Sequence, residues 1–155
     1  MADTIRAALA GLKTRLETIT APARPRVYAD PREAESLAEF PCIVLGLSPT
    51  VQHVVTRKSH GAALNRPALA LWLFVGSRQT PLPELHSRVL DWPDAIVDAI
   101  LADQRLGNSV AGIGDGNVPG EVIRYQPGFI AWADGEYFGI TFNLSVLLVR
   151  TVTMA

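Results

Sequence analysis

The sequence has few of the residues on which common catalytic and metal centres depend. Cys42 is the only cysteine, so neither an internal disulfide nor a cysteine-based zinc site can form. The three histidines, at positions 53, 60 and 86, form no His-x-x-x-His pair, and we interpret them as single surface residues. There is no Gly-x-Ser-x-Gly elbow, and the apolar run PCIVLGL around Cys42 is typical of a protein core. We therefore expect no enzymatic activity, no catalytic residue, no metal and no cofactor.

A large net charge and long apolar runs are missing as well. The 14 Lys and Arg residues and the 15 Asp and Glu residues leave a net charge of −1, which gives no general attraction to nucleic acid. The N-terminus has neither a basic nor a continuous apolar region. The longest apolar runs, ALALWLFVG and LSVLLV, are about half the length that spans a bilayer. We expect a protein made in a cytoplasm, without a signal peptide and without a membrane partner.

What the chain does contain is the composition of a folded domain. With 48% hydrophobic and 19% charged residues, its 155 residues indicate one domain that spans positions 1–155. Low charge combined with many apolar residues also suits a subunit that buries surface against partners.

The first half of the chain predicts a helix, a long connection and then strands. Apolar residues recur at helical spacing over 5–19, and Asp3 or Thr4 is placed to cap the start. Residues 20–41 contain four prolines, which indicates a surface connection with a short edge strand in ARPRVYA and about one helical turn in REAESLAEF. The runs CIVLGLS, VQHVVTR and PALALWLFVG predict strands. Between the last two, the polar stretch KSHGAALNR predicts a hairpin loop.

The second half predicts an interrupted helix followed by strands. Pro93 interrupts the helical stripe of residues 83–102, so we expect a kink or two abutting helices, with Gly107 or Asn108 as the C-terminal cap. The runs EVIRYQPG, GFIAWA and YFGITFNLSVLLVRTV predict strands, and the dipeptide DG at 134–135 is a hairpin signal. In the last strand the even positions from Phe138 to Leu148 are apolar, so this face should pack on helices. The order of elements predicts an α+β domain: an antiparallel or mixed β-sheet flanked by two α-helices, with projecting hairpin loops.

The stretch VAGIGDGNVPG, at 110–120, is dense in glycine, as phosphate-binding loops are. A dinucleotide fingerprint needs G-x-G-x-x-G followed by a helix, whereas this G-x-G-x-G run is followed by a strand pattern and has no adjacent Lys-Ser/Thr pair. We therefore interpret Gly112, Gly114 and Gly116 as part of a flexible, twisted β-ribbon that contacts a neighbouring structure and settles on docking.

The predicted hairpin loop is the most basic part of the chain. It contains Lys58, His60 and Arg66 and directly follows Arg57. Contact with DNA phosphates and docking onto an acidic protein surface are both open interpretations, since four groups are few and no aromatic residues lie between them. We take these four residues as a candidate interface.

Three stretches carry a resemblance to a known family. After the N-terminal amphipathic helix comes the proline-rich link RVYADPREAESLAEFPCIVLGLSP, in which Pro41 opens the first central strand. The stretch DAIVDAILADQRLGNSVAGIGDG follows as a second helix ending in a Leu-Gly turn, and GEYFGITFNLSVLLVR as a closing long strand. In this layout, over most of its length, the chain resembles the tail terminator proteins of long-tailed bacteriophages, minor tail proteins that close the tail tube.

The resemblance implies a structural virion protein. Such proteins form a homohexameric ring at the head-proximal end of the tail tube, stop tube polymerisation and join the tail to the head. The implied partners are other copies of the chain, the major tail tube protein and the head-tail connector or stopper protein, while genome DNA passes through the lumen without sequence-specific binding. The implied location is the virion tail or neck, after assembly in the host cytoplasm. We expect the segment around Arg57, Lys58 and His60 to reach a neighbouring subunit or the tail tube.

Two other functions remain open. A head-tail stopper, or neck completion protein, would occupy the other side of the same joint. A small ligand-binding or enzymatic α+β domain would use the segment from Gly112 to Gly116 and a cation held by Asp91, Asp94 and Asp98, which share one helical face. A solvated helix face is the favoured interpretation of that acidic row.

Overall fold

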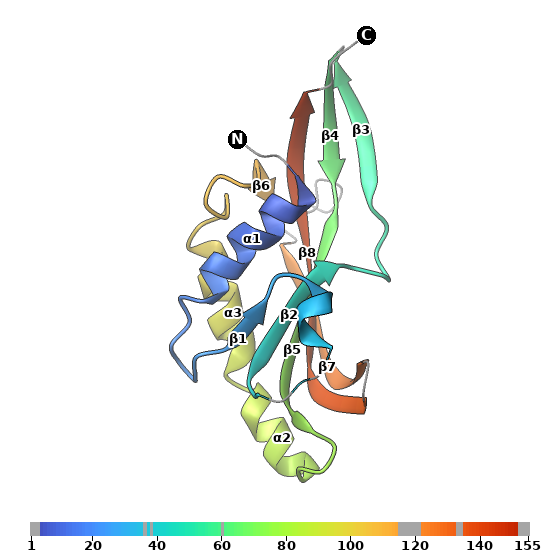
Figure 1. The fold of residues 1–155 in the computed structure, drawn as a ribbon. Helices are drawn as coiled ribbons and strands as arrows, with labels where there is room; N and C mark the ends of the chain where they lie inside the picture. The colour runs from blue at the N-terminus through green and yellow to red at the C-terminus, as the bar shows by residue number, and fades with distance from the viewer. Residues whose placement is uncertain are drawn as a thin grey trace.

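One long strand, β8 (Gly135–Thr151), organises the sheet (Figure 1). On one side it pairs with β5 (Ala68–Ser77) and, further along, with β4 (Ala62–Arg66). On the other side it pairs with β7 (Ile123–Trp132) and β6 (Gly112–Ile113). The computed structural model describes residues 4–35, 37, 39–59, 61–114, 122–132 and 135–151. The strands are β1 (Arg26–Tyr28), β2 (Cys42–Leu47), β3 (Val54–Ser59), β4 (Ala62–Arg66), β5 (Ala68–Ser77), β6 (Gly112–Ile113), β7 (Ile123–Trp132) and β8 (Gly135–Thr151).

The sheet is mixed and open. Its main path runs β1-β2-β5-β8-β4-β3, and β6 and β7 pair with β8 off this path. Among the described pairs, β1 and β2 run parallel and the others run antiparallel. The predicted α+β fold is confirmed, including the short strand at the margin of the sheet that the prolines around β1 indicated.

The helices lie on one face of this sheet (Figure 1). They are α1 (Ile5–Leu16), α2 (Leu82–Val89) and α3 (Trp92–Leu101), and a 3₁₀ turn, η1 (Pro31–Ala34), follows β1. Thr4 caps α1, since its hydroxyl accepts a hydrogen bond from the Ala7 N–H at 3.1 Å. Pro93 stands in the first turn of α3, where no intrahelical donor is lost, so the expected break is a junction between two abutting helices.

The main core lies between the helices and one face of the sheet. The even-numbered residues of β8 are buried there as predicted, together with residues of β2, β5 and the three helices. The buried β8 residues are Phe138, Ile140, Phe142, Leu144, Val146 and Leu148. Each buried side chain of this size contributes roughly 1.5–3 kcal/mol of transfer free energy, so the row fixes the register of β8.

A second, smaller cluster covers part of the opposite face. The segment around η1 packs there against aromatic residues of β5, β7 and β8. The Trp132 indole N–H donates a hydrogen bond of 2.6 Å to the Ala34 carbonyl, and the Trp132 ring lies 5.4 Å from both the Trp72 and Phe74 rings. The proline-rich connection thus packs over one end of the sheet through the segment around η1.

The prediction of a loop over residues 58–66 is wrong. Strand β3 continues to Ser59, and β4 begins at Ala62, so the two strands form a hairpin whose described turn residue, Gly61, has a φ of 80°. Pairing with β8 imposes strand structure on β4, although its own sequence has no alternating pattern. His60 lies outside the described residues.

The expected C-terminal cap of the second helix is also misplaced. Helix α3 ends at Leu101, and the Asp103 carboxylate then accepts hydrogen bonds from the backbone N–H groups of Arg105 (3.1 Å) and Gly107 (2.8 Å). This local turn competes with continuation of the helix. Gly107 and Asn108 have the positive φ that is typical of a cap residue, but they lie in the turn after the end of α3.

The two strands predicted in 121–133 are one continuous strand, β7, which pairs with β8 from Ile123 to Trp132. Pro127 lies within β7 opposite Ile140. Because proline has no N–H, this pair is a non-hydrogen-bonded one, and the position is tolerated since β7 lies at an edge of the described sheet.

Strands β3 and β4 and residues 148–151 of β8 form a three-stranded arm (Figure 1). The arm extends past the helical layer, and the last described residues of β8 belong to it. At its base, His53 Nδ1 accepts a hydrogen bond of 2.9 Å from the Ala68 N–H, so the ring proton is on Nε2, which donates to the Ser48 carbonyl at 3.1 Å. His53 therefore fastens the chain entering β3 to the adjoining ends of β2 and β5.

Candidate interaction surface

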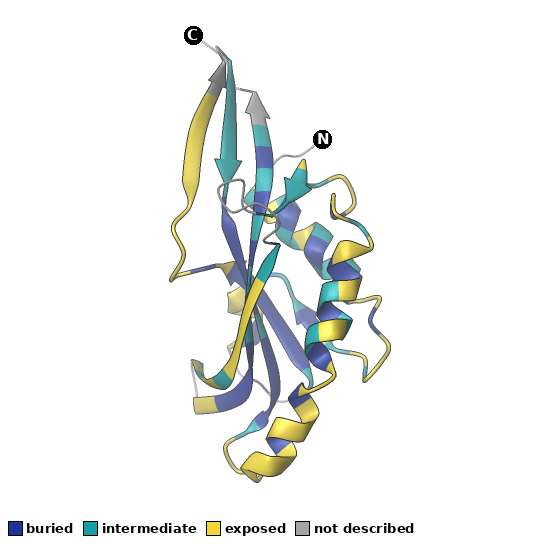
Figure 2. Ribbon diagram, turned by 180° about the vertical axis from the view of Figure 1, so that it is seen from behind, coloured by how far each residue is buried: buried dark blue, intermediate teal, exposed yellow. Residues whose placement is uncertain are grey.

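Apart from Leu148, which belongs to the main core, the described residues of the three-stranded arm are not covered by a second layer. Its strands pack chiefly on one another, and all residues of β4 are only partly buried. On β3, Val54 and Val55 are 42% and 67% exposed. Figure 2 shows the exposed and intermediate colours along the described parts of both strands, in contrast to the buried centre of the sheet. A sheet with apolar residues open to water lacks the second layer that stabilises such structures.

The structure separates the residues of the predicted basic cluster. Arg57 pairs with Ala63 toward the tip of the hairpin, whereas Arg66 pairs with Val54 at its base. Side chains alternate along a strand, so Arg57 shares a face with Val55, and Arg66 lies on the opposite face with Val54. The backbone of Lys58 belongs to β3 at a bulge between Arg57 and Ser59. Arg57 and Arg66 therefore do not form one basic tip but lie on opposite faces of the hairpin.

The glycine-rich stretch is anchored to β8 where the structure describes it. Gly112 belongs to β6 and pairs with Leu147, and the Gly114 N–H donates a hydrogen bond of 2.7 Å to the Ser145 carbonyl. Gly114 has a φ of 105°, which favours glycine. Both residues lie beside β8 just before the arm begins, whereas Gly116 is outside the described residues.

The acidic row predicted on the second helix is exposed. Asp94 and Asp98 are exposed residues of α3, and Asp91 is the exposed N-cap residue before it. Within the described parts of the chain, no group of His, Cys, Asp or Glu is arranged to hold a metal ion. Two leucines border the row: Leu90 is 61% exposed and Leu101 is 40% exposed. Sequence reasoning missed these leucines, although Asp94, Asp98 and Leu101 follow one another at helical spacing and so share a face.

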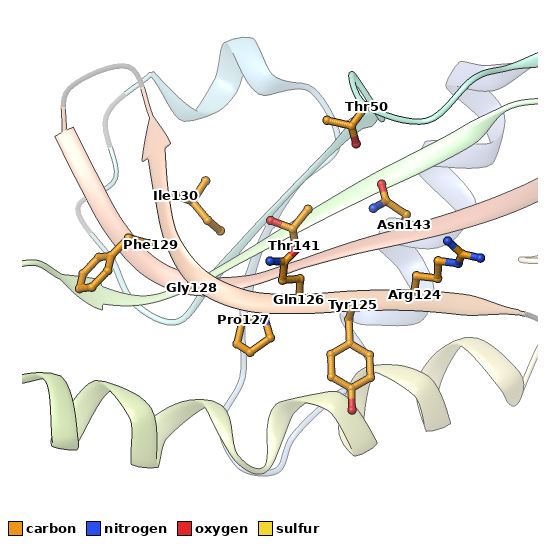
Figure 3. Close-up of a pocket in the computed structure, with 10 residues that line it drawn as sticks. All are labelled: Thr50, Arg124, Tyr125, Gln126, Pro127, Gly128, Phe129, Ile130, Thr141 and Asn143. Atoms are coloured by element: carbon orange, nitrogen blue, oxygen red, sulfur yellow. The ribbon is translucent and has the colours of Figure 1, made fainter.

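A polar hollow of about 530 Å³ lies on the sheet face opposite the helices (Figure 3). Arg124 and Gln126 of β7 and Thr141 and Asn143 of β8 line it with their side chains. Tyr125 and Pro127 also border it, but their side chains point to the helix side of β7. The Asn143 side-chain oxygen is buried and has no hydrogen-bond partner among the described residues.

An apolar groove of about 530 Å³ lies between α2 and β7. Leu82 and Phe129 line it and are 54% and 44% exposed. The Phe129 ring packs edge-on against the Phe138 ring with centroids 5.1 Å apart, and the Arg78 guanidinium lies 5.5 Å from the Phe129 centroid. Exposed apolar side chains therefore occur along β7 as well as on the arm.

Among the displaced pKa values, those of Cys42 and Asp30 move furthest from their ordinary range. Burial, assisted by the negative charge of Glu39, raises the pKa of the Cys42 thiol to about 12. The Cys42 side chain is 1% exposed, so the predicted core role of Cys42 is confirmed. Hydrogen bonds from the Arg32 side chain and backbone lower the pKa of Asp30 to about 2. Neither group lies in one of the two hollows.

The comparisons with known proteins add no family to this description. No protein-family model matches the chain, and no curated protein matches it in sequence. In the described part of the chain, no helix has both the length and the apolar character needed to cross a membrane.

Proposed function

We propose that this protein is a structural subunit of the tail-terminator type, which forms a ring on the head-proximal end of a phage tail tube and joins the tail to the head connector. Under this proposal its partners are copies of itself, the tube protein and the connector. It acts by surface contact and performs no bond-making chemistry. The uncovered three-stranded arm is the observation that carries the proposal.

The arm supports an assembly role because its exposure is costly for an isolated subunit. Val54 and Val55 leave apolar surface in water on both faces of the same strand, and each would gain roughly 25 cal/mol for every Å² that a partner covers. His53 and the pairing of β4 with β8 hold the arm to the body of the protein. A positioned apolar projection of this kind is typical of a surface that is completed by another chain.

The outer edges of the sheet are protected against the addition of further strands. The bulge between Arg57 and Ser59 interrupts the outer edge of β3, and Pro127 removes a donor from the outer edge of β7. Bulges, charged residues and prolines protect sheet edges against unlimited strand addition. A subunit that ends a polymer needs closed contacts, so this protection agrees with the proposed role.

The observation that favours a ligand-binding function is the hollow around Asn143. The buried side-chain oxygen of Asn143 has no hydrogen-bond partner among the described residues and could accept a hydrogen bond from a ligand. Nucleotides or divalent ions that raise the melting temperature of the purified protein would favour that alternative.

The proposed function is tested in a phage that lacks this gene, with the gene supplied on a plasmid as the control. The terminator role predicts overlong tails without heads, and normal tails when the plasmid is present. Tails of normal length that fail to join full heads would instead assign the stopper role. Normal-length tails joined to full heads in the absence of the gene would refute both.

A further inference from the structure

The arm and the segment that contains α3 carry charges of opposite sign. The arm, residues 54–66 and 148–151, contains four basic residues and no acidic one, and residues 90–104 contain four acidic residues and no basic one. The basic residues are Arg57, Lys58, Arg66 and Arg150; the acidic ones are Asp91, Asp94, Asp98 and Asp103. Segments of opposite charge within one chain are complementary between two copies of that chain.

Each segment also has exposed apolar residues beside its charges. On the arm, Val55 and Arg57 are exposed and point to the same side of β3. Val55 pairs with Asn65, and Asn65 with the core residue Leu148, so this side is the continuation of the helix-covered face. On α3, Asp98 and Leu101 form the corresponding exposed pair.

We propose that the helix-side face of the arm of one subunit packs on the outer face of α3 of a second copy, with Arg57 against Asp98 and Val55 against Leu101. The neighbour's helix thereby continues, beneath the arm, the helical layer that α1, α2 and α3 provide for the rest of the sheet. This contact rests on the proposed assembly function and names the surfaces that join the copies.

The spacings of the two pairs are similar. Residues two apart on a strand are separated by about 6.6 Å. Residues three apart on a helix have Cβ atoms about 5–6 Å apart. A salt bridge and an apolar contact can therefore form side by side between Arg57–Val55 and Asp98–Leu101.

The contact is heterologous, because the arm and α3 are different surfaces of each copy. Every subunit then offers one arm and one receiving helix, which is the connectivity of a closed ring if the rotation between subunits closes. The self-complementary surface of a two-fold dimer is not used. A single charge reversal should therefore break all contacts of the same kind in the ring.

The test is self-association of the purified full-length protein, measured by sedimentation velocity over a range of concentrations at low salt. Arg57→Glu and Asp98→Arg should each weaken self-association at least about tenfold, since each places like charges together. An equimolar mixture of the two variants should associate again, because each contact then joins either two native or two reversed partners. The combined variant, Arg57→Glu with Asp98→Arg, should associate by itself. About 1 M salt should weaken the wild-type contact through screening.

Matched controls use residues of the same charge on other surfaces. Arg66→Glu reverses a charge on the opposite face of the arm, and Glu33→Arg reverses an exposed charge at η1; both should leave self-association unchanged. Melting temperatures verify that each variant is folded. A wild-type protein that stays monomeric at about 1 mM, an Arg66→Glu effect as large as that of Arg57→Glu, or a mixture that fails to associate would overturn the proposal. A protein that fails these tests and still controls tail length would leave the proposed function standing.

Discussion

Gly11 provides a test in which local helix propensity and tertiary packing predict opposite results. It lies in the middle of α1, where glycine is about 1 kcal/mol less favourable than alanine. A Cβ added at Gly11 would overlap the Leu106 carbonyl oxygen and the Ser109 hydroxyl, which belong to the turn after α3. Ser109 is held in place because its hydroxyl donates a hydrogen bond of 2.7 Å to that same carbonyl.

The packing effect should exceed the propensity effect. Overfilling a packed site costs about 1–3 kcal/mol, and disturbing the Ser109 hydrogen bond costs about 1 kcal/mol more. After subtraction of the roughly 1 kcal/mol gained in propensity, Gly11→Ala should destabilise the protein by about 2 kcal/mol. For a chain of this length, that change lowers the melting temperature by about 4–8 °C.

Urea unfolding followed by circular dichroism measures the change, and Ala10→Gly, at an exposed position of α1, is the control. The control should lose about 1 kcal/mol through propensity alone. Adding Ser109→Ala to Gly11→Ala removes one of the two overlapping atoms and should cost less than the sum of the single changes. If Gly11→Ala stabilises the protein, the close approach of the turn to α1 is wrong.

Two further predictions follow from the displaced pKa values. The buried Cys42 thiol, with its pKa raised to about 12, should resist alkylation by iodoacetamide between pH 7 and 9 in the native protein and react fully in denaturant; rapid native labelling would contradict its burial. The pKa of Asp30 is lowered from 3.8 to about 2, so the stability it contributes is fully present above pH 4 and is lost as the pH falls toward 2. Urea midpoints of the wild type should therefore fall more steeply over this range than those of Asp30→Asn, and parallel curves would refute the effect.

The helices and central strands could be predicted because their local patterns agree with their environments. The apolar row from Phe138 to Val146 alternates with small or polar residues, and it faces the helical layer. The strands of the arm could not be predicted in the same way. In Ala62–Arg66 no face is fully buried, so the sequence has no alternation to preserve, and pairing with β8 decides the structure.

The candidate surface was only partly accessible to sequence reasoning, for a geometrical reason. Arg57 and Arg66 are close in sequence, but the period of two along a strand and the reversal at the hairpin place them on opposite faces. The number of residues in the turn decides which residues share a face, and a one-residue difference would exchange them. Composition alone could identify the basic segment but could not show which of its residues share a face.

The placement of Arg57 and Arg66 on opposite faces of the arm has a functional consequence. If Arg57 and Arg66 shared a face, electrostatic attraction would let either end of the hairpin contact an acidic partner, with many orientations of similar energy. With Arg57 beside Val55 on the helix side of the arm, a docked helix must satisfy a charge and an apolar contact together. Since surface charge pairs alone contribute about 0–1 kcal/mol, the apolar contact supplies most of the affinity, and the charge selects the orientation. Substitution of Val55 by Ser should therefore weaken the contact between copies while leaving its salt dependence unchanged, whereas Arg57→Gln should reduce the salt dependence.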